Sequence, residues 1–228
     1  IITFFLGLVI LLSGERSALL MFLIYLLFYL LFFGNIRRNL IYFLVFLLAI
    51  IGVIFSNQNI KERIVTHTFS SNQINWNGDR LVYFSQVHER LYLTSIEIFK
   101  DNFFFGIGTK MFREKCKEPK YEKPNGCSTH PHNFLLQLLA ETGIFGTFPY
   151  LILYLYCLKN YFLFFFKKIS KQKEDLYLTK FCILMLPFVI NFNPILPSGN
   201  FFNNWLAAIN WMSFGFILHY LNIDKKIK

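Results

Sequence analysis

The sequence predicts an all-α integral membrane protein, a polytopic helical bundle with a large, partly helical extracytoplasmic loop. Three observations lead to this prediction. Of the 228 residues, 55% are hydrophobic and only 16% are charged, whereas a soluble domain carries about 25% charged residues. Several uncharged runs approach or exceed the roughly 20 residues of a membrane helix. The short basic clusters between these runs fall on one predicted side of the membrane. This composition argues against a soluble enzyme and against a disordered chain.

The N-terminal part, residues 1–56, is predicted to form membrane helices. Residues 1–14 are uncharged but too few to cross a hydrocarbon core, so the first helix is expected to be truncated. Neither a Met nor the basic n-region of a signal peptide precedes this run, so further spans are expected upstream. Two longer uncharged runs, residues 17–36 and 39–60, supply the next two helices.

The rest of the chain divides into a polar loop, an apolar part and a short tail. Residues 57–131 are polar with mixed charge, and they are predicted to form the extracytoplasmic loop with an amphipathic helix. Residues 132–223 are predicted to hold three further membrane helices. These helices are expected over residues 134–158, 176–191 and 204–222, with asparagines and prolines marking the turn between the last two. Residues 224–228 form a basic tail that is predicted to be cytoplasmic.

The placement of the basic residues sets the predicted topology. With Arg37 and Arg38 in the cytoplasm, the following helices also bring the lysines of residues 167–173 and of the tail to the cytoplasmic side. Arg16 and the loop of residues 57–131 then lie outside. Much of the net charge of +10 is therefore a topology signal. We expect membrane lipids, and no nucleic acid, as surroundings.

The four cysteines fall into two pairs. Cys157 and Cys182 lie in apolar runs and are predicted to be small core residues. Cys116 and Cys127 lie in the predicted outer loop, where they form either a disulfide in an oxidising compartment or two free thiols. Their spacing does not match a Cys-x-x-Cys motif, so it indicates neither a redox site nor a zinc site.

The outer loop contains a predicted helix followed by a glycine turn. Residues 81–100 have the apolar periodicity of an amphipathic helix that lies outside the membrane. Three phenylalanines at 103–105 suggest a loop that dips toward the bilayer surface. Gly106 and Gly108 permit a tight turn, whereas a lone Gly-x-Gly is weak evidence for phosphate binding.

The segment around His132 is the most informative part of the sequence. Pro131 suits the first turn of a helix, with Ser128 or Thr129 as candidate caps, so His132 and Asn133 are expected at its N-terminus. Free N–H groups and the helix dipole there favour an anion. Helical spacing places two glycines on the face of His132, at positions 143 and 146, where they would let a neighbouring helix approach. The alternative is a packing stripe below a surface histidine.

Two other features also have a structural and a functional interpretation. Arg16 fits either a side chain that snorkels to the interface and pairs with Glu15, or a cation at the outer mouth of a cavity. His130 and His132 are weak as metal ligands because no clear carboxylate set accompanies them, so no metal is predicted.

Three motifs, spanning residues 13–147, resemble those of the O-antigen ligase and O-antigen polymerase family, which includes protein O-oligosaccharyltransferases. The most specific is the spacing His132-Asn133, nine residues, Gly143-x-x-Gly146-Thr147. The turn Ser13-Gly14-Glu15-Arg16-Ser17-Ala18 is similar to a second family motif, in which Glu15 replaces a small or polar residue. The third motif is Arg90, followed by Lys100-Asp101-Asn102 and Phe105-Gly106-Ile107-Gly108, with a phenylalanine where proline is common.

The resemblance implies an enzyme of bacterial surface polysaccharide biosynthesis. Such enzymes transfer a glycan from a polyprenyl-diphosphate donor to an acceptor hydroxyl at the outer face of the cytoplasmic membrane. The acceptor is a lipid A core for a ligase, or a second lipid-linked glycan for a polymerase. By resemblance, Arg16 and Arg90 hold the diphosphate, and His132 acts on the acceptor hydroxyl or helps to position the donor. Asn133 contacts substrate, orients His132 or caps the helix. The family chemistry implies no cofactor and no metal.

Two other functions account for part of the sequence. A transporter or flippase of lipid-linked saccharide would explain Arg16, Arg90 and the multiple spans, but it explains the His132 motif less well. A membrane scaffold would explain only the spans. Glu141 lies roughly opposite the His132 face, and we expect it to be structural or to pair with a buried polar group.

Overall fold

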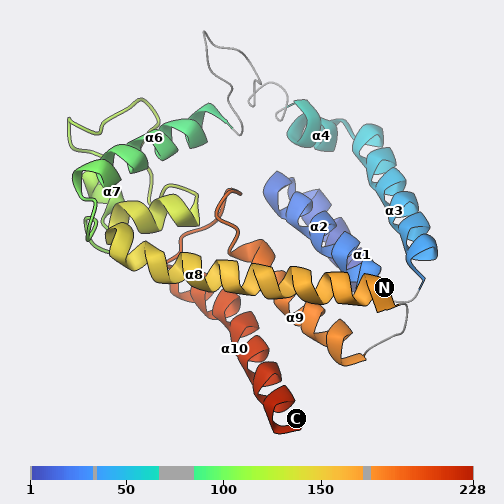
Figure 1. Ribbon diagram of the computed structural model, residues 1–228. Helices are drawn as coiled ribbons and strands as arrows, with labels where there is room; N and C mark the ends of the chain where they lie inside the picture. The colour runs from blue at the N-terminus through green and yellow to red at the C-terminus, as the bar shows by residue number, and fades with distance from the viewer. Residues whose placement is uncertain (1, 33–34, 67–84, 172–175, 228) are drawn as a thin grey trace.

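The computed structural model describes residues 2–32, 35–66, 85–171 and 176–227. These residues form helices and no strand, which confirms the all-α prediction for the described part of the chain. The elements, labelled in Figure 1 where there is room, are α1 (Ile2–Ser13), α2 (Arg16–Phe32), α3 (Ile36–Ser56), α4 (Gln58–Lys61), a π-helical turn (Glu62–Thr66), α6 (Gln86–Asp101), α7 (Phe112–Lys115), α8 (Phe134–Lys171), α9 (Leu176–Asn191) and α10 (Asn204–Ile227).

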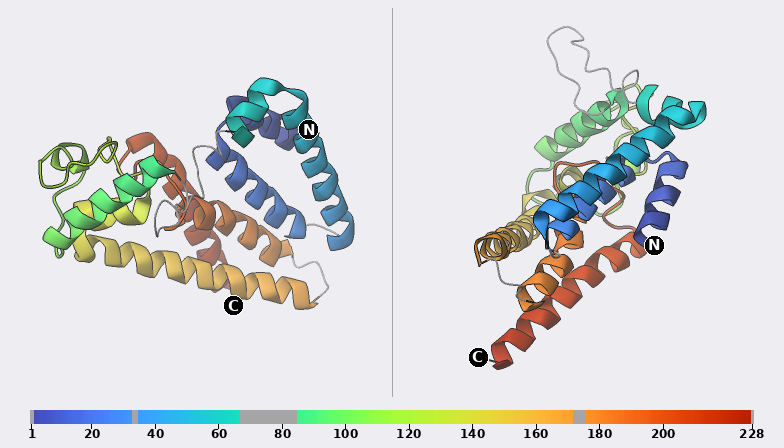
Figure 2. Two further views of the ribbon diagram at one scale, coloured as in Figure 1. Left: turned by 90° about the horizontal axis from the view of Figure 1, so that it is seen from above. Right: turned by 90° about the vertical axis from the view of Figure 1, so that its right-hand side faces the viewer.

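The first three helices form one packed group. α2 contacts both α1 and α3, and the buried residues of this group include Leu11, Leu19 and Ile54. Helix α3 begins three residues earlier than the sequence predicts, because the Asn35 side chain accepts hydrogen bonds from the backbone N–H groups of the next turn. Figures 1 and 2 show this group on the side of the molecule opposite α6 and α7.

Helices α8, α9 and α10 form the second and larger core. α9 packs against α8, α10 and α2, and thereby links the two groups. Cys157 and Cys182 are fully buried in this core and form no disulfide, which confirms the prediction that they are small core residues. The three helices correspond to the three predicted spans, although α8 continues to Lys171 and α10 to Ile227.

Two described helices are long and apolar enough to cross a membrane. They are α3 and the part of α8 from Phe134 to Lys167, while the apolar stretches Arg16–Leu31 and Thr179–Asn191 are shorter. Large apolar side chains on both long helices are exposed, among them Leu48 on α3 and Leu155 on α8. Exposed apolar surface of this extent is uncommon on soluble proteins. The number of membrane crossings stays a prediction.

The loop of residues 57–131 contains several short elements and the predicted amphipathic helix. That helix is α6; residues 81–84 of its expected range lie outside the described residues, as does Lys173. The side chain of Ser85 caps α6 by accepting the N–H of His88. Leu91 and Ile98, seven residues apart, are buried on the face that packs toward α8.

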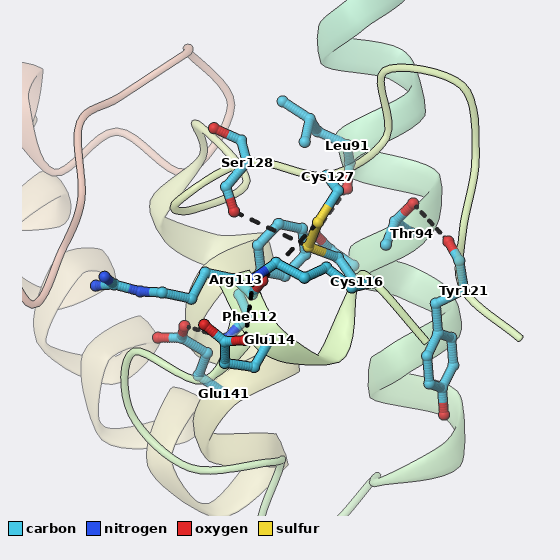
Figure 3. The surroundings of a disulfide bond; sticks show 12 residues. Leu91, Thr94, Phe112, Arg113, Glu114, Cys116, Tyr121, Cys127, Ser128 and Glu141 are labelled. Atoms are coloured by element: carbon cyan, nitrogen blue, oxygen red, sulfur yellow. Dashed lines mark hydrogen bonds and ion pairs between the residues drawn. A yellow bond between two sulfur atoms is a disulfide. The ribbon is translucent and has the colours of Figure 1, made fainter. Parts of the chain in front are cut away.

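A disulfide joins Cys116 to Cys127 and decides between the two states that the sequence leaves open (Figure 3). It fastens the segment after α7 to residue 127, and Cys116 packs with Leu91 and Phe112 in a small buried cluster.

We expect the loop to lose stability when this disulfide is removed. The Cys116→Ser variant should lose about 3 kcal/mol, because the bond closes a short loop and restricts the unfolded chain. Thermal unfolding in detergent measures the loss, and Cys127→Ser should reproduce it without adding to it in the double variant. Unreduced, denatured protein should expose only the thiols of Cys157 and Cys182 to a thiol reagent. Labelling of all four cysteines without reductant would contradict the disulfide.

Candidate functional site

The site is built around a break in helix α8 at Gly143. The backbone of Gly143 has φ 64° and ψ −166°, a conformation essentially restricted to glycine. The break divides α8 into a short first segment, beside α6, and a long second segment that runs away from it (Figure 1). A helix break leaves C=O groups before it and N–H groups after it without helical partners.

The glycine loop after α6 supplies those partners. The N–H groups of Ile144 and Phe145 donate to the carbonyls of Phe103 and Phe104, at 2.8 and 3.3 Å. In the other direction, the N–H groups of Ile107 and Gly108 donate to the carbonyls of Ala140 and Glu141, at 3.1 and 2.9 Å. Four backbone hydrogen bonds therefore fix the loop of residues 103–108 across the break.

This contact explains why glycine occupies two of the motif positions. A Cβ on Gly143 would lie 2.4 Å from backbone atoms of Phe104, and a Cβ on Gly106 would lie 2.4 Å from the carbonyl carbon of Glu141. The predicted approach of a neighbouring helix at Gly143 and Gly146 is therefore wrong. Gly143 admits the loop backbone instead, while a Cβ on Gly146 would meet Thr142 of its own helix.

The tight turn predicted at the Gly-x-Gly is confirmed. Gly106 and Gly108 have φ values of 66° and 99°, in the region that favours glycine. Their N–H groups donate within the protein, to Asn102 and Glu141, so the turn serves to close the loop on α8. The phenylalanines before the turn are exposed, and the rings of Phe104 and Phe105 pack against Phe145 of α8.

Glu141 anchors the next part of the same loop. Its carboxylate is fully buried and accepts hydrogen bonds from the backbone N–H groups of Phe112 (Figure 3) and of Lys110, both at 3.0 Å. The Gln137 side chain donates to the same carboxylate at 3.1 Å and to Asn200 at 2.9 Å. The structural role predicted for Glu141 is thus confirmed: it connects the outer loop, α8 and the segment after α9.

Replacement of Glu141 should destabilise this part of the protein. Glu141→Ala removes the acceptor of two backbone N–H groups and of one N–H of the Gln137 amide, whose other bond, to Asn200, remains. Each unpaired buried donor costs about 1–3 kcal/mol. Glu141→Gln keeps the volume and one oxygen, so its loss should be smaller. Thermal unfolding is the measurement, and Glu114→Ala is the matched control because Glu114 forms an exposed ion pair. Equal stability of Glu141→Ala and Glu114→Ala would contradict the anchoring role.

Helix α8 begins one residue after Asn133, which caps it. The Asn133 side chain accepts the N–H of Leu136 at 3.0 Å and donates to the carbonyl of Pro194 at 2.9 Å. The caps expected at Ser128 or Thr129 are therefore wrong, because the helix starts later than the proline suggests. The helix-capping alternative for Asn133 is confirmed. Its side chain is buried, and its contact with substrate stays a prediction.

His132 lies just before α8 and is not part of the helix face that carries Gly143 and Gly146. Its φ of 56° is unusual for a residue other than glycine, and its carbonyl accepts the N–H of Ser198 at 2.9 Å. The backbone around His132 is thus held by the Asn133 cap on one side and by the segment after α9 on the other. The expected placement of His132 in line with Gly143 is wrong, since His132 does not belong to the helix.

Three imidazole rings lie together at this end of α8. The ring centroid of His132 lies 4.1 Å from that of His130 and 5.5 Å from that of His88 on α6. Burial lowers the pKa of all three below the ordinary 6.5, and that of His130 to about 4. Protonation of two neighbouring rings would place two positive charges side by side, so the neutral form of each imidazole is favoured. Each ring is therefore available at neutral pH as a proton acceptor or as a neutral donor.

Arg16 reaches this cluster from the other helix group. It begins α2 directly after the turn at Gly14, where φ is 71°, and its charge acts on His88, whose pKa it lowers further. Arg90 is placed differently. It lies two residues after His88, about 200° around α6, and its guanidinium donates to the carbonyl of Pro124 at 2.7 Å. The structure thus brings Arg16 and His132 to His88 and places Arg90 against the loop.

Among the described residues, no group of three or more His, Cys, Asp or Glu side chains has the arrangement needed to hold a metal ion. The residues around His132 instead combine a cation, neutral imidazoles and the N-terminus of α8. Such a set is suited to binding an anion next to a proton acceptor.

The comparison with family models identifies the group to which the chain belongs. A model described as O-antigen ligase matches residues 1–151, about two thirds of the chain. The chain belongs to the O-antigen ligase family. The match includes all three motifs that resemble this family in the sequence. No curated protein and no solved structure matches the chain.

Sequence reasoning missed two residues of the site. The sequence pattern presents His88 only as the start of an amphipathic helix, and Ser85 belongs to none of the three motifs. The one signal that could have found His88 is its position two residues before Arg90 of the family motif. Only the packing of α6 on α8 shows that His88 faces His132.

Proposed function

We propose that the protein transfers a glycan from a polyprenyl-diphosphate donor to an acceptor hydroxyl at the outer face of the bacterial cytoplasmic membrane. The observation that carries this proposal is the match to the O-antigen ligase family over the residues that form the site. The proposal is also supported by the position of His132 beside His88, whose pKa is lowered by the charge of Arg16. The acceptor in this proposal is a lipid A core or a second lipid-linked glycan.

In the proposed reaction, the acceptor oxygen attacks the sugar carbon that carries the diphosphate. A new carbon–oxygen bond forms, the bond to the diphosphate oxygen breaks, and polyprenyl diphosphate leaves with the bonding electrons. His132 takes the proton of the acceptor hydroxyl, which suits an imidazole that is neutral at physiological pH. Arg16 holds the diphosphate and stabilises its increasing negative charge. Arg90 is assigned the same role by the family resemblance alone, since its guanidinium donates to the carbonyl of Pro124 on the loop. The chemistry requires neither a cofactor nor a metal in this scheme.

We also propose a multi-pass membrane location with the site facing outward. Two helices of membrane-spanning length, the exposed apolar side chains and the one-sided basic clusters support this arrangement. The disulfide supports an extracytoplasmic position of the loop that carries α6. Arg16, at the start of α2, lies on the same predicted side as that loop.

Transfer by the reconstituted full-length protein tests the proposal. Proteoliposomes receive a polyprenyl-diphosphate glycan together with a lipid A core acceptor or a second lipid-linked glycan, and the product is followed by mass. Arg16→Ala and Arg90→Ala should each reduce transfer, and Arg16→Lys should restore only part of it, since lysine cannot bind phosphate bidentately. Movement of the donor across the bilayer without transfer would overturn the proposal in favour of a transporter.

A further inference from the structure

His88 is a residue of the site that neither the sequence motifs nor the proposed reaction use. It lies in the first turn of α6, and its ring is half-buried among groups from three parts of the chain. His132 contacts it from the segment before α8, Tyr92 contacts it from α6 itself, and Arg16 acts on it from α2. Ser85 holds it from the start of α6. His88 therefore lies between Arg16, which is proposed to bind the diphosphate, and His132, which is the proposed base.

The ring of His88 is held in a fixed orientation. The Oγ atom of Ser85 lies 2.7 Å from Nδ1 of His88 and also accepts the backbone N–H of His88 at 3.2 Å. This serine is the N-cap of α6, so the ring is fastened to the end of a helix that packs on α8. The Ser85 oxygen already accepts the backbone N–H, so we assign its hydroxyl as the donor to Nδ1, and the ring proton of a neutral imidazole then lies on Nε2.

We propose that His88 is a further substrate-contacting residue, whose Nε2–H donates a hydrogen bond to the donor diphosphate between Arg16 and His132. This inference rests on the proposed function, because it assigns a ligand to the same site. Three features support it: the fixed ring, the position between the two groups, and the start of α6, whose helix dipole also favours an anion.

The protonation of His88 fits a neutral donor. Burial, the neighbouring His132 and the charge of Arg16 all lower its pKa below 6.5, in that order of importance. Burial raises the pKa of Tyr92 to about 12, so this neighbour is uncharged at neutral pH. His88 is therefore neutral at physiological pH, and its hydrogen bond to phosphate does not depend on protonation of the ring.

Binding of polyprenyl diphosphate without glycan tests the inference, since this probe requires no transfer. Purified full-length protein in detergent is titrated with the probe at pH 7.5. His88→Phe should weaken binding by about tenfold to a hundredfold, the range expected for a hydrogen bond to a charged group. His88→Gln keeps an N–H donor at a similar reach and should recover most of the affinity. His219→Phe, at an exposed histidine of α10, is the matched control and should bind as the wild type does.

The pH dependence separates a neutral donor from a cation. The affinity ratio of wild type to His88→Phe should stay constant from pH 7 to pH 8.5, because titration of the probe affects both proteins equally. A ratio that falls to one at pH 8.5 would overturn the neutral donor. Unchanged binding by His88→Phe, with unfolding at the wild-type temperature, would overturn the contact itself. If the wild type binds the probe but transfers no glycan to either acceptor, the result contradicts the proposed function and not the contact made by His88.

Discussion

Replacing His132 with alanine should lower the rate of glycan transfer by about 10²- to 10⁴-fold, the usual contribution of a general base. His132 is held outside α8 by the cap at Asn133 and by the hydrogen bond from Ser198, so the variant should leave the helix start intact. Transfer in proteoliposomes measures the rate, and thermal unfolding verifies the fold. His219→Ala is the control for loss of a histidine elsewhere. Transfer at the wild-type rate by folded His132→Ala would show that His132 is not the base.

The pH profile adds a second test of the same role. Burial lowers the pKa of His132 from 6.5, and protonation abolishes its ability to accept a proton. Transfer should therefore be constant at alkaline pH and fall along an acidic limb whose midpoint lies below pH 6.5, as the ring becomes protonated. An acidic limb with its midpoint above pH 7 would contradict a neutral His132 in the free enzyme. Burial and the adjacent His132 ring keep His130 neutral as well, with a pKa of about 4, so its titration lies below this range.

Local signals in the sequence predicted most of the helices. Apolar runs and periodicity identified α2, α3, α6, α8, α9 and α10, because helix formation depends on composition within a few turns. Boundaries were less accurate where a single side chain decides them. Asn35 caps α3, whose start the sequence interpretation placed at residue 39, after the two arginines. Asn133 caps α8 at the start that the apolar run predicts, residue 134, whereas Pro131 suggested an earlier first turn.

Contacts between distant segments could not be predicted in the same way. Helical periodicity placed Gly143 on a regular face, since a sequence pattern carries no sign of a break that another segment completes. The partner loop lies some 40 residues earlier, and its four backbone hydrogen bonds involve no side chain that a motif could reveal. The same holds for His88, whose neighbour His132 becomes visible only when α6 packs on α8.

The glycine at position 143 should be among the least replaceable residues of the chain. Gly143→Ala places a Cβ 2.4 Å from the backbone of Phe104, and the backbone conformation alone costs about 1–3 kcal/mol for a residue other than glycine. Relief of this contact requires the loop to move away from α8, which breaks the hydrogen bonds of Ile144 and Ile107 across the break. Because the loop connects α6 to α8, His88 and His132 should then separate.

We therefore expect Gly143→Ala to lose both stability and transfer, and Gly106→Ala to behave alike because its Cβ meets the other side of the same contact. Gly52→Ala is the matched control. Gly52 lies in α3, and a Cβ added there would meet nothing within 4 Å, so alanine should be neutral or stabilising by up to about 1 kcal/mol. Thermal unfolding and transfer are the measurements. If Gly143→Ala unfolds at the temperature of Gly52→Ala and transfers normally, the loop does not seal the break as the structure indicates.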